Sequence, residues 1–185
     1  MVNERDVIQN KIDKSAQELI FNYGIKGWSM DTCAKDAGIT KRTLYHYIDS
    51  KENLVERVLV NYIRSVQNEL SNRLNAAKDF QAAIDVMIDI FPKLITRMDS
   101  RVFRDIFTNY PLLEKKIIEE RQSIAKEAYE YILRLKKKGF IKDKVSPEVL
   151  IEIIQSLIIY YLKTDPENFE TKVKEGFTLV LEGVF

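Results

Sequence analysis

The chain has 185 residues, of which 45% are hydrophobic and 31% charged, and its formal net charge at pH 7 is +1. This composition is that of an ordinary globular protein, and the balance of charge excludes a uniformly basic nucleic-acid binder, so any such affinity must come from a local patch. The single cysteine, Cys33, excludes an internal disulfide. The longest apolar stretch, residues 149–162, is shorter than the roughly 20 residues of a membrane span. With a charged N-terminus and no membrane partner expected, we predict a cytoplasmic protein.

Helical periodicity dominates the sequence. Glycine and proline are few, at six and four residues, and apolar residues recur mostly at three- and four-residue spacing. This pattern predicts an all-α fold of about nine helices. The first helix is expected from about residue 3 to Tyr23, with Gly24 as its left-handed stop. A short second helix follows, with Ser29 as its N-cap and Met30 and Cys33 on its inner face.

The segment after the next turn combines basic, aromatic and hydroxyl side chains. Thr40 can cap a helix of about two turns, in which Leu44 and Ile48 face inward. The opposite face then presents Arg42 and His46, flanked by Thr43 and Tyr45, with Lys41 at the N-terminal end. Such side chains can bind phosphate oxygens and reach base edges. A helix, a tight turn and a second short helix with an exposed polar face are typical of a helix-turn-helix.

A fourth helix is expected to start at Asp49 or Ser50, which places Lys51 in its first turn. A cation there opposes the helix dipole and indicates a nearby anion.

The stretch from Ser15 to Leu59, with TLYHY followed by SKENL, resembles the head of the tetracycline-repressor (TetR) family. The resemblance implies that Thr43, Tyr45 and His46 face DNA and that Lys41 and Lys51 bind the phosphate backbone. It further implies that Ser29 and Thr40 cap their helices against the DNA strand. Arg42 stands where many members have glycine, so a long side chain replaces a bare backbone and the operator sequence cannot be transferred.

The chain is expected to divide into a helix-turn-helix head, residues 1–49, and a helical body, residues 50–185. The fourth helix should join them without a flexible linker. Further helices are expected over residues 80–98, kinked at Pro92, and over residues 101–109, 112–138, 147–163 and 167–183. In the body the resemblance extends only to layout, and it implies a ligand-binding and dimerisation domain.

The last two helices are the predicted dimer contact. The segment 149–162 is apolar almost all round, which burial on two sides would explain. The final helix carries a second apolar stripe that can complete an intermolecular four-helix bundle. The candidate interface residues are Ile154, Ile158, Tyr161, Val173, Phe177 and Val180.

The middle of the body offers flexible and aromatic side chains near polar groups, as binding sites do. The candidate wall residues are Met87, Phe91, Phe103, Phe107 and Tyr110, and the candidate polar neighbours are Arg97, Arg101, Arg104 and Asn109. A stripe of this kind at helical spacing is more usually plain core, and both interpretations remain open.

Three functions compete on these observations. The first is a homodimeric regulator, most often a repressor, that binds near-palindromic double-stranded operator DNA and responds to a small, largely apolar effector. The second is an enzyme, for which the sequence offers one histidine, one cysteine, no phosphate loop and no metal-ligand spacing. We therefore expect no catalytic residue, metal or cofactor. The third is a helical interaction protein that keeps the fold without DNA function, and the basic residues of the head speak against it.

Overall fold

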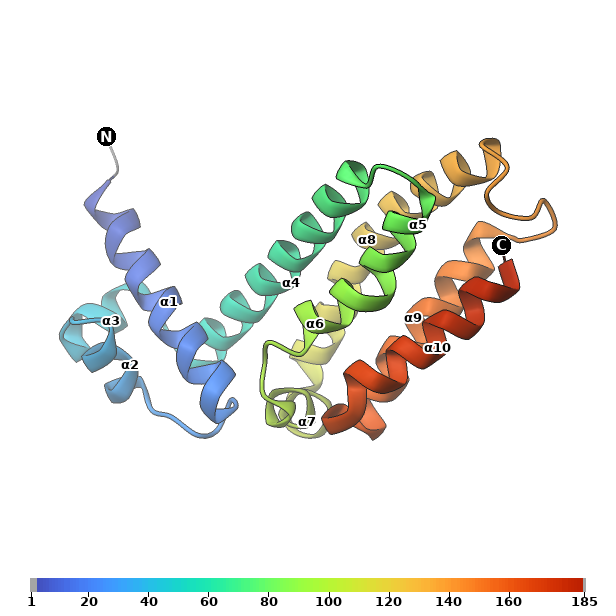
Figure 1. Ribbon diagram of the computed structural model, residues 1–185. Helices are drawn as coiled ribbons and strands as arrows, with labels where there is room; N and C mark the ends of the chain where they lie inside the picture. The colour runs from blue at the N-terminus through green and yellow to red at the C-terminus, as the bar shows by residue number, and fades with distance from the viewer. Residues whose placement is uncertain (1–2, 185) are drawn as a thin grey trace.

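A computed structural model describes residues 3–184, with side chains for all of these except 121–124 and 184. Every regular element in that range is helical, which confirms the predicted all-α fold (Figure 1). The helices are α1 (Glu4–Tyr23), α2 (Met30–Asp36), α3 (Lys41–Tyr47), α4 (Lys51–Ala76), α5 (Phe80–Asp85), α6 (Phe91–Ile95), α7 (Ser100–Asn109), α8 (Pro111–Lys137), α9 (Pro147–Thr164) and α10 (Phe169–Val184). A π-helical turn, η1 (Val86–Ile90), and a 3-10 turn, η2 (Pro166–Asn168), complete the order.

The starts of α2, α3 and α4 are set by side-chain caps. Ser29, Thr40 and Ser50 each accept the backbone N–H of the residue three positions later. Such caps satisfy N–H groups that have no partner inside the helix. The predicted caps Ser29 and Thr40 are therefore confirmed, and Ser50 rather than Asp49 caps α4. Gly24 ends α1 as predicted, but at φ 73 and ψ −179 it has a positive φ that favours glycine rather than the left-handed helical conformation expected.

The helix expected over residues 80–98 is interrupted and shorter. The N–H of Phe91 reaches back to the carbonyl of Val86, which widens the chain into the π-helical turn just before Pro92. Proline supplies no N–H and its ring crowds the preceding turn, so a widened turn relieves both problems. The helix ends at Ile95, and Met98 is buried in the connection to α7.

One apolar core extends through both parts of the molecule. The head, defined here as α1–α3, lies at one end of α4, and the remaining helices lie on the other side of α4, along its length (Figure 1). Buried side chains from the head, such as Ile12 and Leu44, belong to the same cluster as Phe169 and Phe177 in the body. A smaller cluster around Ile141 closes the far end of the body. Within residues 3–184, none of the helices combines the length and apolar character needed to cross a membrane.

Candidate DNA-binding surface and ligand cavity

The outer face of α3 is the candidate DNA-binding surface. Leu44 and Ile48 are buried, at 0% and 3% exposure, and they fix the helix on the core. The side chains on the opposite face are therefore directed outward: Lys41, Arg42, Tyr45 and His46 are exposed, and Thr43 is half-buried. This is the arrangement that the helical spacing predicts.

Hydroxyl groups hold the two helices of this unit at their N-terminal ends. The Ser29 hydroxyl accepts the N–H of Thr32 at 3.1 Å, and the Thr40 hydroxyl accepts the N–H of Thr43 at 3.0 Å. Ser29 and Thr40 are both exposed. The structure thus places each capping residue at the surface with its side chain committed to its own helix.

Lys41 spans the gap between α3 and α2. Its Nζ lies 2.7 Å from a carboxylate oxygen of Asp31, and both side chains are exposed. The hydrogen bond to Asp31 raises the pKa of Lys41, which keeps the ammonium charged. A cation at the surface is therefore held in place by a neighbouring anion.

Lys51 has a structural contact that the sequence does not reveal. Its Nζ donates to the carbonyl oxygen of Trp28 at 2.5 Å and lies 4.3 Å from the centroid of the Trp28 ring. Burial lowers the pKa of Lys51. A cation over an indole ring is attracted by the negative ring face. Lys51 thus attaches the α1–α2 connection to the start of α4.

The body contains a partly open cavity of about 850 Å³ between α4 and the helices from α5 to α10. The predicted wall residues Met87, Phe91, Phe103 and Phe107 line it. Tyr110, the fifth predicted wall residue, lies where α7 passes into α8, and its half-buried side chain packs against the core outside the cavity lining.

Two walls were missed by sequence analysis. One comes from α4, with Tyr62, Val66 and Leu70, and another from α9, with Ile154 and Ile158. The long apolar stripe of α4 and the all-round apolar character of α9 are the signals that could have found them. The polar lining includes Gln67, Ser71 and Asn75 from α4, and Arg134 from α8.

The three arginines expected beside the cavity form ion pairs outside it. Arg97 pairs with Glu69, Arg101 with Asp99 and Arg104 with Glu167. None of the three belongs to the cavity lining. Among the side chains that are described, no group of three or more His, Cys, Asp or Glu residues is arranged to hold a metal ion.

Three of the six residues proposed for the dimer contact are buried in the chain's own core. Ile158, Val173 and Phe177 are 9%, 0% and 1% exposed, which leaves them no surface for a partner. Ile154, Tyr161 and Val180 are half-buried. The physical reason is that α9 and α10 pack on each other and on the body, so their most apolar stripes turn inward.

Other apolar side chains of the same two helices remain exposed. Val149, Ile153 and Tyr160 on α9 are 51%, 43% and 59% exposed, and Leu179 on α10 is 72% exposed. At 100° per residue, the three α9 positions fall within one narrow stripe. We name these four residues the outer stripe.

The fold and the surface of α3 define a helix-turn-helix protein with a hollow helical body. Residues 12–58 match the family of bacterial regulatory proteins described as the tetR family. The chain is also 23% identical to an uncharacterized HTH-type transcriptional regulator, YvdT of Bacillus subtilis (strain 168), over 92% of this chain and 91% of the relative. Residues 12–58 thus match the head of the TetR family, and the comparisons support a TetR-family transcriptional regulator.

Solved structures show the same fold along the whole chain. A TetR-family transcriptional regulator from Cytophaga hutchinsonii superposes with a TM-score of 0.76 at 14% identity, covering 100% of this chain and 98% of that one. The fatty acid degradation regulator FadR from Bacillus halodurans gives 0.66 at 17% identity, covering 93% of each chain. These matched proteins are regulators rather than enzymes.

Tyr62 generates a testable prediction at the cavity wall. Its hydroxyl donates to the carbonyl oxygen of Leu94 at 2.5 Å, and burial raises its pKa to about 12. We expect Tyr62→Phe to lower the free energy of unfolding at pH 7 by about 1 kcal/mol, because a buried hydrogen bond is lost. The phenol ionises near pH 10 in the unfolded chain. The stability that it contributes is therefore complete below pH 10 and is lost as the pH rises through about 12.

Urea denaturation at pH 7 and at several values above pH 10 measures this difference. The deficit of the variant should shrink as the pH rises. Tyr23→Phe is the matched control, since Tyr23 is 54% exposed. A deficit for Tyr62→Phe that is constant with pH would contradict the assignment.

Proposed function

We propose that this regulator is a homodimeric repressor that binds near-palindromic double-stranded operator DNA and is released from it by a small, largely apolar ligand. In this proposal residues 1–49 bind DNA, residues 50–185 bind the ligand and form the dimer, and the protein acts in the cytoplasm. The observation that carries it is the outer face of α3, where Arg42, Tyr45 and His46 are exposed opposite a buried Leu44.

The proposed DNA contacts divide into two kinds. Arg42, Thr43, Tyr45 and His46 lie on the face that would enter the major groove, where side chains read base edges. Lys41 and Lys51 would contact phosphates, which position the protein without reading sequence. Lys51 has three N–H donors, and the Trp28 carbonyl takes one of them. Ser29 and Thr40 would contribute through the capped helix ends, which favour anions.

Arg42 and Lys51 should differ in what their loss does to DNA binding. We expect Arg42→Ala to relax base preference at one operator position, at a cost of roughly 1–3 kcal/mol. Lys51→Ala should weaken binding to all sequences alike and reduce the salt slope by about one unit. Selection of genomic fragments followed by gel shifts over a salt series measures both effects.

Lys14→Ala is the control, because Lys14 is exposed on α1 rather than on α3. A selection in which Arg42→Ala keeps the base preference of the unmutated protein would rule out base reading by Arg42. Failure of the unmutated protein to retain any fragment would rule out the DNA-binding function itself.

A dimer through α9 and α10 is supported by the outer stripe. Four large apolar side chains are exposed on two helices that contact each other, and exposed apolar surface gathered in one region is of the kind that marks a protein contact. Twofold symmetry of such a contact would present two heads to two half-sites. Half-buried Ile154, Tyr161 and Val180 can border this contact, whereas the outer stripe would supply its centre.

Charges in the outer stripe should therefore produce monomers. We expect Ile153→Glu and Leu179→Glu to dissociate the dimer, because each would place an unpaired charge in an apolar interface. Val7→Glu is the matched control: Val7 is 41% exposed on α1, in the head rather than on α9 or α10. Light scattering at micromolar concentration distinguishes the states. A monomeric unmutated protein would refute the proposed dimer.

The effector proposal is supported by the size and lining of the cavity. A volume of about 850 Å³ suits a small molecule, and Met87, Phe91, Phe103 and Phe107 make much of its surface apolar. Gln67 and Ser71 offer hydrogen bonds to a polar group of the ligand. The structural neighbour from Bacillus halodurans is a fatty acid degradation regulator, so fatty acids are the first compounds to test.

Ligand binding and DNA binding should oppose each other by the same factor. A thermal-shift screen of fatty acids and other hydrophobic compounds identifies binders, and each binder is then titrated into the preformed protein–operator complex. Met87→Trp should weaken ligand binding about tenfold by filling part of the cavity, while Leu112→Trp should not. Binders that stabilise the protein and leave operator affinity unchanged would disprove the coupling.

A further inference from the structure

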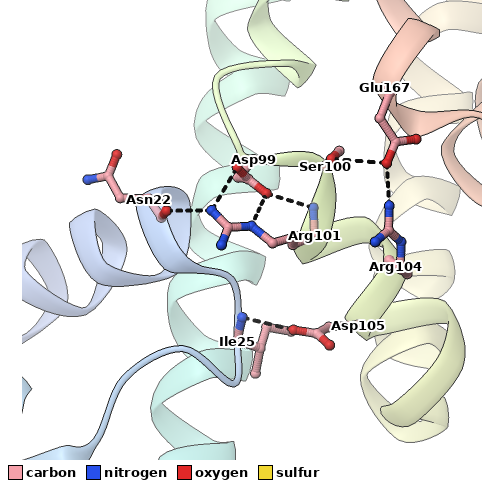
Figure 2. A network of polar contacts seen from close by, with 8 residues as sticks. All are labelled: Asn22, Ile25, Asp99, Ser100, Arg101, Arg104, Asp105 and Glu167. Carbon is pink, nitrogen blue, oxygen red and sulfur yellow. Dashed lines mark hydrogen bonds and ion pairs between the residues drawn. The ribbon is translucent and has the colours of Figure 1, made fainter.

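Three hydrogen bonds join the end of α1 and the turn after it to α7 and its N-cap, and Figure 2 draws the two that involve Arg101 and Asp105. The backbone N–H of Asp99 donates to the carbonyl of Phe21 at 3.1 Å, and Arg101 Nη2 donates to the carbonyl of Asn22 at 2.9 Å. In the opposite direction, the N–H of Ile25 donates to Asp105 Oδ2 at 3.1 Å. The last carbonyls of a helix have no partner within it. The body therefore supplies the C-terminal cap of α1, and we name this set of contacts the clasp.

The clasp is held rigidly on the body side. Asp99 accepts two hydrogen bonds from the Arg101 guanidinium, at 2.7 and 3.0 Å. These bonds orient the guanidinium toward the carbonyl of Asn22. The same guanidinium lowers the pKa of Asp99, so the pair stays ionised. On the head side the turn approaches closely: a Cβ added at Gly24 would lie 3.3 Å from Arg101 Cβ and 3.4 Å from Asp105 Oδ2.

The other polar side chains of α7 reach a different part of the body. Ser100 and Arg104 both bond to the carboxylate of Glu167 in η2, the connection between α9 and α10 (Figure 2). One short helix thus contacts the head through Asp99, Arg101 and Asp105, and the helices of the proposed dimer through Glu167.

The head has a second attachment through α4. Arg57 on α4 binds Asp13 on α1 at 2.5 Å, and the two helices share the apolar core. A single attachment along one helix allows the head to rock about that helix. The clasp is a separate attachment at the far end of α1, and it fixes the angle of the head to the body.

We propose that Arg101 and Asp105 are positioning residues for DNA binding, which fix the angle of the head to the body and hence the operator half-site spacing that the dimer accepts. The proposal rests on the proposed DNA-binding function and on the proposed dimer. It concerns neither the residues that touch DNA nor those that touch a ligand.

Operators of altered spacing test the proposal. Starting from an operator selected by the unmutated protein, one base pair is inserted at or removed from the centre, which shifts a half-site by roughly 3.4 Å. The ratio of dissociation constants, altered over original, measures spacing discrimination. We expect Asp105→Ala and Arg101→Ala each to lower this ratio about fivefold, because each removes one restraining hydrogen bond.

Two variants separate positioning from general destabilisation. Asp105→Asn retains a carbonyl oxygen that can accept the Ile25 N–H, so it should keep the ratio of the unmutated protein. Arg64→Gln removes an ion pair between α4 and α8 that does not involve the head, and it too should leave the ratio unchanged. Loss of folded protein would weaken binding to all three operators equally and leave the ratio unaltered.

A measurement without DNA gives an independent result. Spin labels at Lys35→Cys and Lys137→Cys, both exposed, report the distance from head to body, with labelled chains diluted into unlabelled protein. Cys33 is fully buried and is replaced by alanine as a precaution. The distance distribution should broaden in Asp105→Ala and remain narrow in Asp105→Asn.

The outcomes are distinguishable. An unaltered spacing ratio in both alanine variants, or an equal loss of affinity on all three operators, would overturn the positioning role. An unmutated protein that binds no DNA would overturn the proposed function. In that event a distance distribution as narrow in Asp105→Ala as in the unmutated protein would overturn the clasp as well, and a broadened one would uphold it.

Discussion

Burial along α4 is the constraint on which the remaining structure depends. Leu54 and Val55 are buried near its start, where α1 packs on it, and Tyr62 and Val66 are buried further along, within the body. Full burial of such a side chain stabilises the fold by about 1.5–3 kcal/mol. Exposed ion pairs contribute far less, so the apolar core and not the salt bridges decides where the head sits. The polar contacts then refine an arrangement that the core has already imposed.

The same constraint exposes the proposed DNA-binding surface. With Leu44 and Ile48 committed to the core, the polar residues of α3 have no inward position left. The chain carries almost no net charge, so attraction to phosphate depends on a few cations, among them Lys41 beside Asp31. Ion pairs this exposed are weakened by solvent and salt. A phosphate can therefore replace Asp31 as the partner of Lys41 at little cost.

The sequence predicted best what is decided locally. Helix limits follow from caps such as Ser29 and from stops such as Gly24, each set by a few neighbouring residues. It predicted poorly which apolar stripe of a helix faces which neighbour. The helix α9 is apolar on several sides, and only its packing shows that Ile158 faces the cavity while Ile153 faces solvent. The position of Arg101 outside the cavity is likewise set by a tertiary contact, because its partner Asn22 lies 79 positions away in the sequence.

The position of α7 links the two proposals for the body. Residues 103, 106 and 107 line the cavity, and residues 101 and 105 hold the head. Positions 101 and 103 lie about 200° apart around a helix, so these two functions occupy nearly opposite faces. A helix moves as a rigid body when its backbone hydrogen bonds are kept. A ligand that displaces Phe103 or Phe107 together with the α7 backbone therefore displaces Arg101 and Asp105 as well. The displacement then reaches the head through α7 rather than through α4.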